Sequence, residues 1–109
     1  MDSAGSSGRT RQLEVRGARL AFTDDGAGSV VLNAHGLTSS RANNRRMGLP
    51  DFGATVGRSH RVISYDARGH GESAGTDAPD DYTWAALAQD LLALADVLSP
   101  DAPVSVIGS

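Results

Sequence analysis

The sequence predicts an α/β fold in which helices flank a mostly parallel β-sheet. This is indicated by an alternation along the chain, where short apolar runs are separated by segments long enough to form helices. Such alternation is typical of parallel sheets with helices on their faces. The 109 residues make at most one small domain. We assign residues 1–11, which have no apolar core, to a disordered tail and residues 12–109 to the domain.

The strands are predicted from their side-chain patterns. Residues 12–16 and 18–25 alternate loosely between apolar and polar side chains, which predicts a β-hairpin. Residues 24–29 are rich in Gly and Asp and predict a further hairpin turn. Residues 30–34 and 60–66 contain short, continuous apolar runs, as expected for strands buried on both faces.

Two helices are predicted between and after these strands. The stretch 39–57 has room for a crossover helix, although Gly48 and Pro50 must interrupt it. The strongest helix follows Tyr82, because Thr83 can cap its N-terminus and its leucines fall on one face. These leucines are Leu87, Leu91, Leu94 and Leu98. Pro100 and Pro103 end the helix, and residues 104–108 predict one more buried strand.

Composition excludes several classes of function. Ten Lys and Arg against 13 Asp and Glu give a net charge of −3, spread along the chain, which favours neither a nucleic-acid nor a membrane-surface partner. The chain has no Cys, which excludes disulfides and thiolate catalysis within it and fits a cytoplasmic protein. Residues 1–10 cannot form a secretory signal, and charges at Asp90 and Asp96 interrupt the longest apolar stretch.

Two ligand-binding patterns are weighed and rejected. Residues 69–74, "GHGESA", match a dinucleotide-binding motif, but no helix follows them directly and Asp66 would repel a phosphate. His35, His60 and His70 lie on separate segments without the spacing of metal ligands. We therefore expect neither a cofactor nor a metal.

The candidate chemistry lies where the predicted parallel strands end. In "AHGLTSS", Gly36 permits a sharp turn after His35, which can direct the backbone N–H of Leu37 into a crevice as a donor to an oxyanion. In "YDARGHGES", Gly69 and Gly71 allow tight turns, and Asp66 and Arg68 are close enough to pair or to bind the loop backbone. We expect this second loop to be structural.

Together, "AHGLTSS", "VISYDARGHGES", the helix after Tyr82 and "VSVIGS" resemble the N-terminal portion of an α/β-hydrolase over residues 20–109. The resemblance implies that "VSVIG" leads into the nucleophile elbow G-x-S-x-G, with Gly108 as its first glycine and Ser109 as its variable residue. The nucleophile would then occupy position 110. Reading Ser109 itself as the nucleophile would put Ile107 where the strained elbow needs a small residue.

The resemblance also implies the reaction. Such enzymes cleave esters, thioesters or lactones of small molecules with a serine, a histidine and an acidic residue, while backbone N–H groups form an oxyanion hole. Leu37 would give one donor, with Thr38 in the same loop, while the histidine and acid would lie beyond the chain. We therefore expect the 109 residues alone to be inactive and to need the C-terminal remainder of their polypeptide as a partner.

Other activities of the scaffold stay open. Epoxide hydrolases and haloalkane dehalogenases of this fold use an aspartate nucleophile, but they usually carry proline where this chain has Thr38. Acyl transfer, perhydrolysis and a catalytically inactive binding protein are further alternatives, since fold alone does not fix function.

Overall fold

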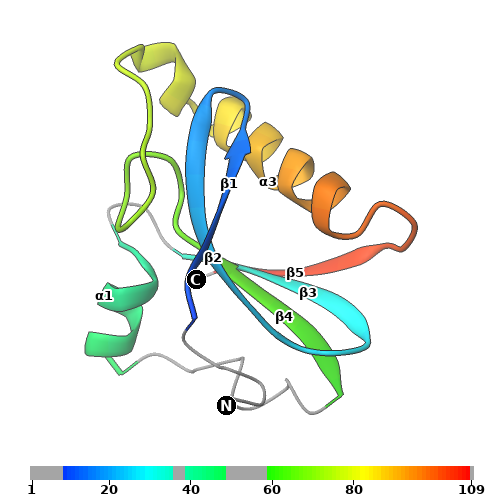
Figure 1. Cartoon of the computed structure of the whole chain (residues 1–109). Coiled ribbons are helices and arrows are strands. Elements are labelled where there is room, and N and C mark those ends of the chain that lie inside the picture. The colour runs from blue at the N-terminus through cyan, green and yellow to red at the C-terminus, as the bar shows by residue number, and fades with distance from the viewer. Residues whose placement is uncertain (1–8, 36–38, 49–58, 109) are drawn as a thin grey trace.

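The computed structural model describes residues 9–35, 39–48 and 59–108, and in these it forms one five-stranded sheet with two α-helices and a short 3-10 helix (Figure 1). The strand order is β1-β2-β4-β3-β5. In chain order the elements are β1 (Arg11–Val15), β2 (Ala18–Gly26), β3 (Ser29–Ala34), α1 (Arg41–Arg46), β4 (His60–Tyr65), the 3-10 helix η2 (Pro79–Tyr82), α3 (Trp84–Leu98) and β5 (Val104–Gly108). Arg11, which we assigned to the tail, is the first residue of β1.

The sheet is mixed. The predicted hairpin is confirmed, because β1 and β2 pair antiparallel around Arg16 and Gly17, whose φ angles are 48° and 84°. Positive φ at both residues suits the two-residue turn that matches the twist of a hairpin. The second predicted hairpin turn is wrong: β2 continues to Gly26 and pairs antiparallel with β4, not with β3. β3 instead pairs parallel with β4 and with β5, as strands joined by crossovers do.

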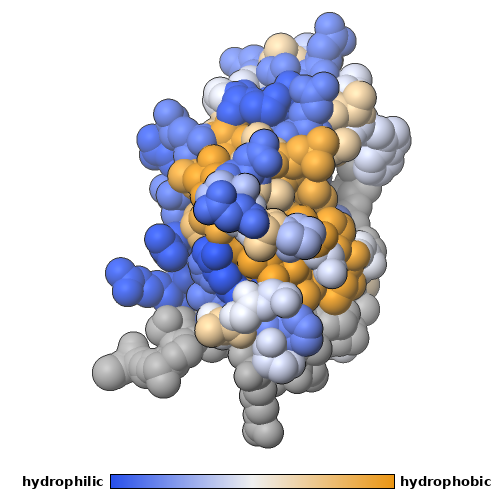
Figure 2. Space-filling view, turned by 90° about the vertical axis from the view of Figure 1, so that its right-hand side faces the viewer, coloured by the Kyte–Doolittle hydropathy of each residue, from blue (hydrophilic) through white to orange (hydrophobic). Residues whose placement is uncertain are grey.

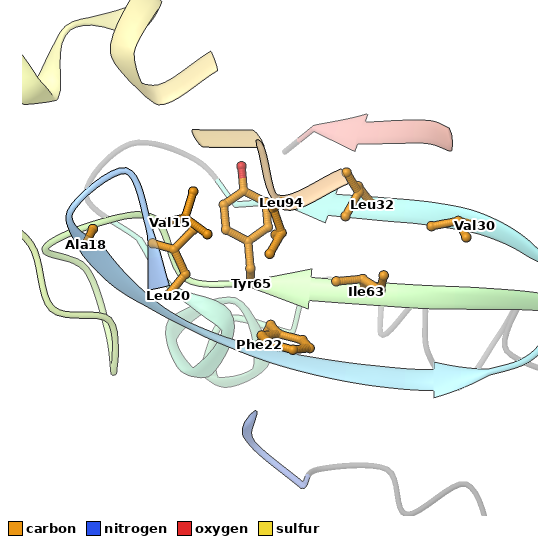
Figure 3. Packing of buried hydrophobic residues seen from close by; sticks show 9 residues of the cluster. All are labelled: Val15, Ala18, Leu20, Phe22, Val30, Leu32, Ile63, Tyr65 and Leu94. Atoms are coloured by element: carbon orange, nitrogen blue, oxygen red, sulfur yellow. The ribbon is translucent and has the colours of Figure 1, made fainter. Parts of the chain in front are cut away.

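The core forms where the sheet meets α3. Nine side chains are buried together there, as Figure 3 shows: Val15, Ala18, Leu20, Phe22, Val30, Leu32, Ile63, Tyr65 and Leu94. Successive strand residues point to opposite faces, and Val31 and Val62 are buried on the other face. The prediction that the central strands are buried on both sides is confirmed.

Helix α3 begins and packs as its sequence predicts. The side chain of Thr83 accepts a hydrogen bond from the N–H of Ala86, which caps the helix. Leu94 is fully buried and the other three leucines of the predicted face are partly buried, whereas Leu92 is 61% exposed. The C-terminal carbonyl of Leu98 accepts a hydrogen bond from Arg61 near the start of β4, so α3 runs back along the sheet.

The last strand is less buried than predicted. β5 pairs with β3 alone in the described part of the chain and forms an edge of the sheet. Val104 and Ile107 are partly buried, while Val106 is 50% exposed. The view from the side of α3 and β5 shows a broad apolar surface (Figure 2). The continuous apolar pattern of β5 thus indicates a strand correctly but overstates its burial in this chain.

A buried ion pair joins α3 to the loop after β4. The Arg68 guanidinium donates to both carboxylate oxygens of Asp90, at 2.6 and 2.8 Å, and these side chains are 1% and 2% exposed. Arg16, in the β1–β2 turn, donates to the same carboxylate at 2.8 Å. Burial and the charge of Asp90 raise the pKa of Tyr65 to about 12. One carboxylate therefore ties three segments together.

Replacing Asp90→Asn should lower the free energy of unfolding by about 3–5 kcal/mol, because the buried Arg68 loses its counter-charge. The matched control is Asp96→Asn on the same helix, since Asp96 is exposed and its loss should cost less than about 0.5 kcal/mol. Urea unfolding of the full-length polypeptide measures both. Equal unfolding midpoints for the two variants would contradict a structural role for the Asp90 carboxylate.

Candidate functional site

The three parallel strands β3, β4 and β5 end at one edge of the sheet. Ala34 at the end of β3 is in register with Tyr65 at the end of β4 and with Gly108 at the end of β5. The carboxyl ends of β3, β4 and β5 therefore lie side by side. The carboxyl ends of parallel strands are where open α/β sheets hold their ligands.

The His35 side chain lies at this edge and contacts the neighbouring loop. Its Nε2 accepts a hydrogen bond from the backbone N–H of Ala67 at 2.9 Å. The His70 ring lies with its centroid 5.4 Å from that of His35, and its Nδ1 is 2.9 Å from the carbonyl oxygen of Arg68. A carbonyl oxygen can only accept, so His70 carries a proton on Nδ1. The His35 ring thus accepts a hydrogen bond from a backbone N–H of this loop, and the His70 ring donates one to a backbone carbonyl of the same loop.

Asp66 is buried and holds its loop to α1. Its Oδ1 accepts from the Arg41 backbone N–H at 2.8 Å and its Oδ2 accepts from the Glu72 N–H at 2.9 Å. The Arg41 guanidinium lies beside the carboxylate, with Nε 3.1 Å from Oδ1. Ser40 caps α1 next to this pair. The carboxylate therefore stabilises the loop after β4 and holds it against the start of α1.

These contacts shift the ionisation of Asp66. Burial, the largest influence, favours the neutral acid, but the side-chain and backbone hydrogen bonds from Arg41, the Glu72 N–H and the Arg41 charge outweigh it. The net result is a pKa of Asp66 below its usual value. The carboxyl is therefore ionised at neutral pH, and it has no proton to give as an acid.

Asp66 and Arg68 do not pair with each other, which was one of the two arrangements expected of them. Arg68 turns inward to Asp90, while Asp66 faces Arg41. Ser73 closes the loop, because its hydroxyl accepts from the Ala21 N–H and donates to the Asp66 carbonyl.

The glycines of this loop fit close to their neighbours. Gly69 and Gly71 both have positive φ, at 71° and 50°. A Cβ on Gly71 would lie 2.5 Å from the Oδ2 of Asp66, and one on Gly69 would lie 3.0 Å from the Tyr82 ring. Both positions thus combine a left-handed backbone with lack of space for a side chain.

The remaining predicted site residues lie outside the described residues, namely Gly36, Leu37, Thr38 and Ser109. Gly108 is described, and its exposed position at the end of β5 puts it beside Ala34. Among the described residues, no group of three or more His, Asp or Glu side chains could hold a metal ion. No helix in the same residues is long and apolar enough to cross a membrane.

The sequence reasoning missed Arg41, Asp90 and Arg16. A signal for Asp90 was present, because it interrupts the apolar face of a helix and a buried carboxylate needs a cation. Arg41 follows a capping serine and offered no comparable signal. The partners of both carboxylates are far apart in the sequence, so only the fold reveals them.

Comparison with known proteins defines the family. The sequence profile described as "alpha/beta hydrolase fold" matches residues 29–109, so the chain belongs to this family. The resemblance inferred from the sequence motifs and the predicted fold class are thereby confirmed. No curated protein sequence matches the chain.

Several solved structures share this fold. Epoxide hydrolase VrEH1 from Vigna radiata is 27% identical with a TM-score of 0.77, over 92% of this chain and 31% of that chain. Epoxide hydrolase A from Mycobacterium thermoresistibile is 28% identical with a TM-score of 0.75, over 92% and 30%. The Cif epoxide hydrolase from Acinetobacter nosocomialis, at 22% identity, a TM-score of 0.76 and coverage of 92% and 29%, shares the fold alone. The chain thus spans under a third of these structures.

Replacing Asp66→Asn should lower the free energy of unfolding at pH 7 by about 2–3 kcal/mol, because a neutral amide loses the charge-assisted bonds from Arg41. A lowered pKa stabilises the fold above the ordinary Asp value of about 3.9, and this stabilisation is lost as the pH falls through the lowered pKa. The difference between wild type and variant should therefore be constant above about pH 5 and shrink as the pH falls below the ordinary Asp value of about 3.9. Urea unfolding of the full-length polypeptide measures it, with the exposed Asp101→Asn as control. A difference that stays constant with pH would contradict this account.

Replacing Gly71→Ala should destabilise the protein more than Gly17→Ala. Both glycines have positive φ, so each substitution carries the left-handed backbone cost of about 1–2 kcal/mol. Gly17 has open space around its Cβ position, whereas the new methyl group at Gly71 must displace the Asp66 carboxylate. Thermal unfolding of both variants compares the two costs. Equal losses would mean that the loop moves away from Asp66 without penalty.

Proposed function

We propose that the polypeptide containing this chain hydrolyses an ester, thioester or lactone of a small organic molecule. The observation that carries the proposal is the parallel pairing of Ala34 with Gly108. This register sets the start of the His-Gly loop beside the strand that leads, in this family, into the nucleophile elbow. An oxyanion donor and a nucleophile need this adjacency, because both must reach one carbonyl group.

In the proposed mechanism, a serine at position 110 attacks the substrate carbonyl carbon. A histidine from a later part of the polypeptide takes the serine proton, and an acidic residue orients that histidine. The negative charge that forms on the carbonyl oxygen is stabilised by the backbone N–H of Leu37 and by the N–H that follows the nucleophile. One such donor is worth about 2.7–4 kcal/mol of transition-state stabilisation. As this intermediate collapses, the bond to the leaving oxygen or sulfur breaks and the histidine gives its proton to the departing alcohol or thiol. Water then cleaves the acyl-enzyme and releases the acid.

The polar side chains of the described loops are held in structural contacts, which fits a proposal in which they take no part in proton transfer. The side chains of Asp66 and Arg68 are engaged with Arg41 and Asp90, so neither is assigned an acid or base role. The His35 Nε2 is occupied by a backbone N–H, which argues against His35 as the proton shuttle. Because the chain has no Cys, the proposal includes a cytoplasmic setting.

A second candidate is epoxide hydrolysis by an aspartate at position 110. It is favoured by the solved structures described as epoxide hydrolases that are 27–28% identical to this chain. The aspartate would open the epoxide to form an ester with the substrate, and water would then cleave that ester. Thr38, in place of the usual proline of that branch, favours the serine reaction.

Labelling of the full-length polypeptide tests both candidates. A fluorophosphonate probe should add its phosphonyl group to a serine at position 110, as read by tandem mass spectrometry, and should abolish ester hydrolysis. For the aspartate candidate, turnover of an epoxide in ¹⁸O-water should leave ¹⁸O in the carboxyl group at position 110. The serine reaction would instead place ¹⁸O in the product acid. If position 110 carries neither the phosphonyl group nor ¹⁸O, both candidates are overturned.

A further inference from the structure

We propose that the outer face of α3 binds a basic amphipathic helix of a partner protein. The site is a row of exposed residues on this helix, spaced four apart, which we call the α3 row: Trp84, Ala88, Leu92 and Asp96. Residues four apart are neighbours on a helix surface, so the row forms one continuous feature. The proposal is independent of the hydrolysis proposed for the carboxyl edge of the sheet.

The apolar part of the α3 row has two bulky side chains on either side of a small one. Trp84 is 73% exposed and Leu92 is 61% exposed. They are about 12 Å apart along the helix axis, since a helix rises 1.5 Å per residue, and Ala88 lies between them. This spacing leaves room for an apolar side chain of a second helix, because helices pack by inserting the ridges of one into the grooves of the other.

The described part of the chain leaves the α3 row uncovered. Helix α3 packs on the sheet through its opposite face, where Leu94 is fully buried. On the side of the molecule formed by α3 and β5, apolar patches adjoin hydrophilic ones (Figure 2). A single exposed apolar residue is ordinary, but apolar residues gathered on one face and bordered by polar groups mark interaction sites. Tryptophan is also among the residues that contribute most to binding at interfaces.

The charges around the α3 row indicate the chemistry of the partner. Charged residues occur along the whole chain, but residues 74–109 contain six Asp and no Lys, Arg or His. Four of these aspartates are exposed and form no ion pair among the described residues: Asp77, Asp80, Asp96 and Asp101. Two precede α3, one ends the row and one follows the helix. Negative charge therefore surrounds the apolar residues, and a complementary surface is apolar and basic.

The place of Asp96 in the helix is an independent reason for a cationic partner. The free carbonyl groups make the C-terminus of a helix negative, so a cation is stabilising there and an anion is not. Asp96 lies two residues before Leu98, the last residue of α3, and the last turn has no basic residue. Arg61 donates to the Leu98 carbonyl, but its guanidinium also pairs with Asp24. A cation from a partner would thus stabilise Asp96.

Two synthetic helices test the site on the full-length polypeptide. The probe is an amphipathic peptide of Leu, Ala and Arg, about 18 residues long so that it can be helical. The control peptide has Glu in place of each Arg. The Arg peptide should bind at least about tenfold more tightly than the Glu peptide at low salt, and added salt should weaken its binding. Isothermal titration calorimetry measures both affinities, and equal affinities would overturn the proposal.

Substitutions locate the binding on the α3 row. Trp84→Ala should weaken binding of the Arg peptide by about 30-fold, as expected for a dominant interface residue. Its control is Val97→Ala, because Val97 is 55% exposed on the same helix but lies outside the row. Asp96→Arg should weaken binding by about five- to tenfold, since attraction becomes repulsion. Its control, Glu14→Arg on β1, changes the net charge equally. Both controls should stay within about twofold of wild type, and a control equal to its partner variant would overturn the proposal.

The accessibility of Trp84 shows whether the rest of the polypeptide already covers the α3 row. The Trp84 signal is the difference in fluorescence between the wild-type polypeptide and its Trp84→Phe variant. Acrylamide should quench this signal in the free polypeptide, and the bound Arg peptide should protect it. A signal protected without the peptide would overturn the proposal, because the polypeptide itself would then occupy the site. Neither result depends on the nucleophile at position 110.

Discussion

The parallel register of β3 with both of its neighbours is the constraint on which the site depends. Parallel strands cannot be joined by tight turns, so each connection must return across the sheet before the next strand begins. Helix α3 makes that return between β4 and β5. As a result, the three strands end at the same edge of the sheet, at Ala34, Tyr65 and Gly108. The β3 residues Val30, Val31 and Leu32 are buried in this register, on both faces of the sheet.

Buried charges then fix the loops at that edge. Taking Arg68 and Asp90 out of water is costly, and a buried ion pair is often no more stabilising than apolar side chains of the same volume. The pair instead fixes the conformation of the loop. Two hydrogen bonds to Asp90 set the orientation of the Arg68 side chain, which restrains the backbone of the loop at Arg68. Arg16 adds the β1–β2 turn to the same carboxylate. The loop after β4 is therefore specified by contacts with α3 and the hairpin as well as by its own glycines.

The sequence predicts the helices and strands well, but it does not predict which strands pair or which side chains contact one another. Thr83 and the leucine spacing define α3 because capping and helical period are local properties, and the hairpin around Gly17 is local too. The order of the strands is not local: nothing in residues 24–29 indicates that β4 would separate β2 from β3. The same holds for the site. The loop residues at Asp66 were found from their motif, whereas their partner Arg41 depends on how α1 packs.

The charges at the carboxyl edge also fit the chemistry proposed there. An ionised carboxylate near a developing oxyanion would oppose catalysis by repulsion between like charges. Asp66 is ionised, as its lowered pKa indicates, but Arg41 lies against it. Asp90 is likewise neutralised by Arg68. An ion pair presents less net charge to its surroundings than a lone carboxylate does, so the pairing of Asp66 with Arg41 weakens the repulsion that this buried acid would exert on an oxyanion formed beside its loop.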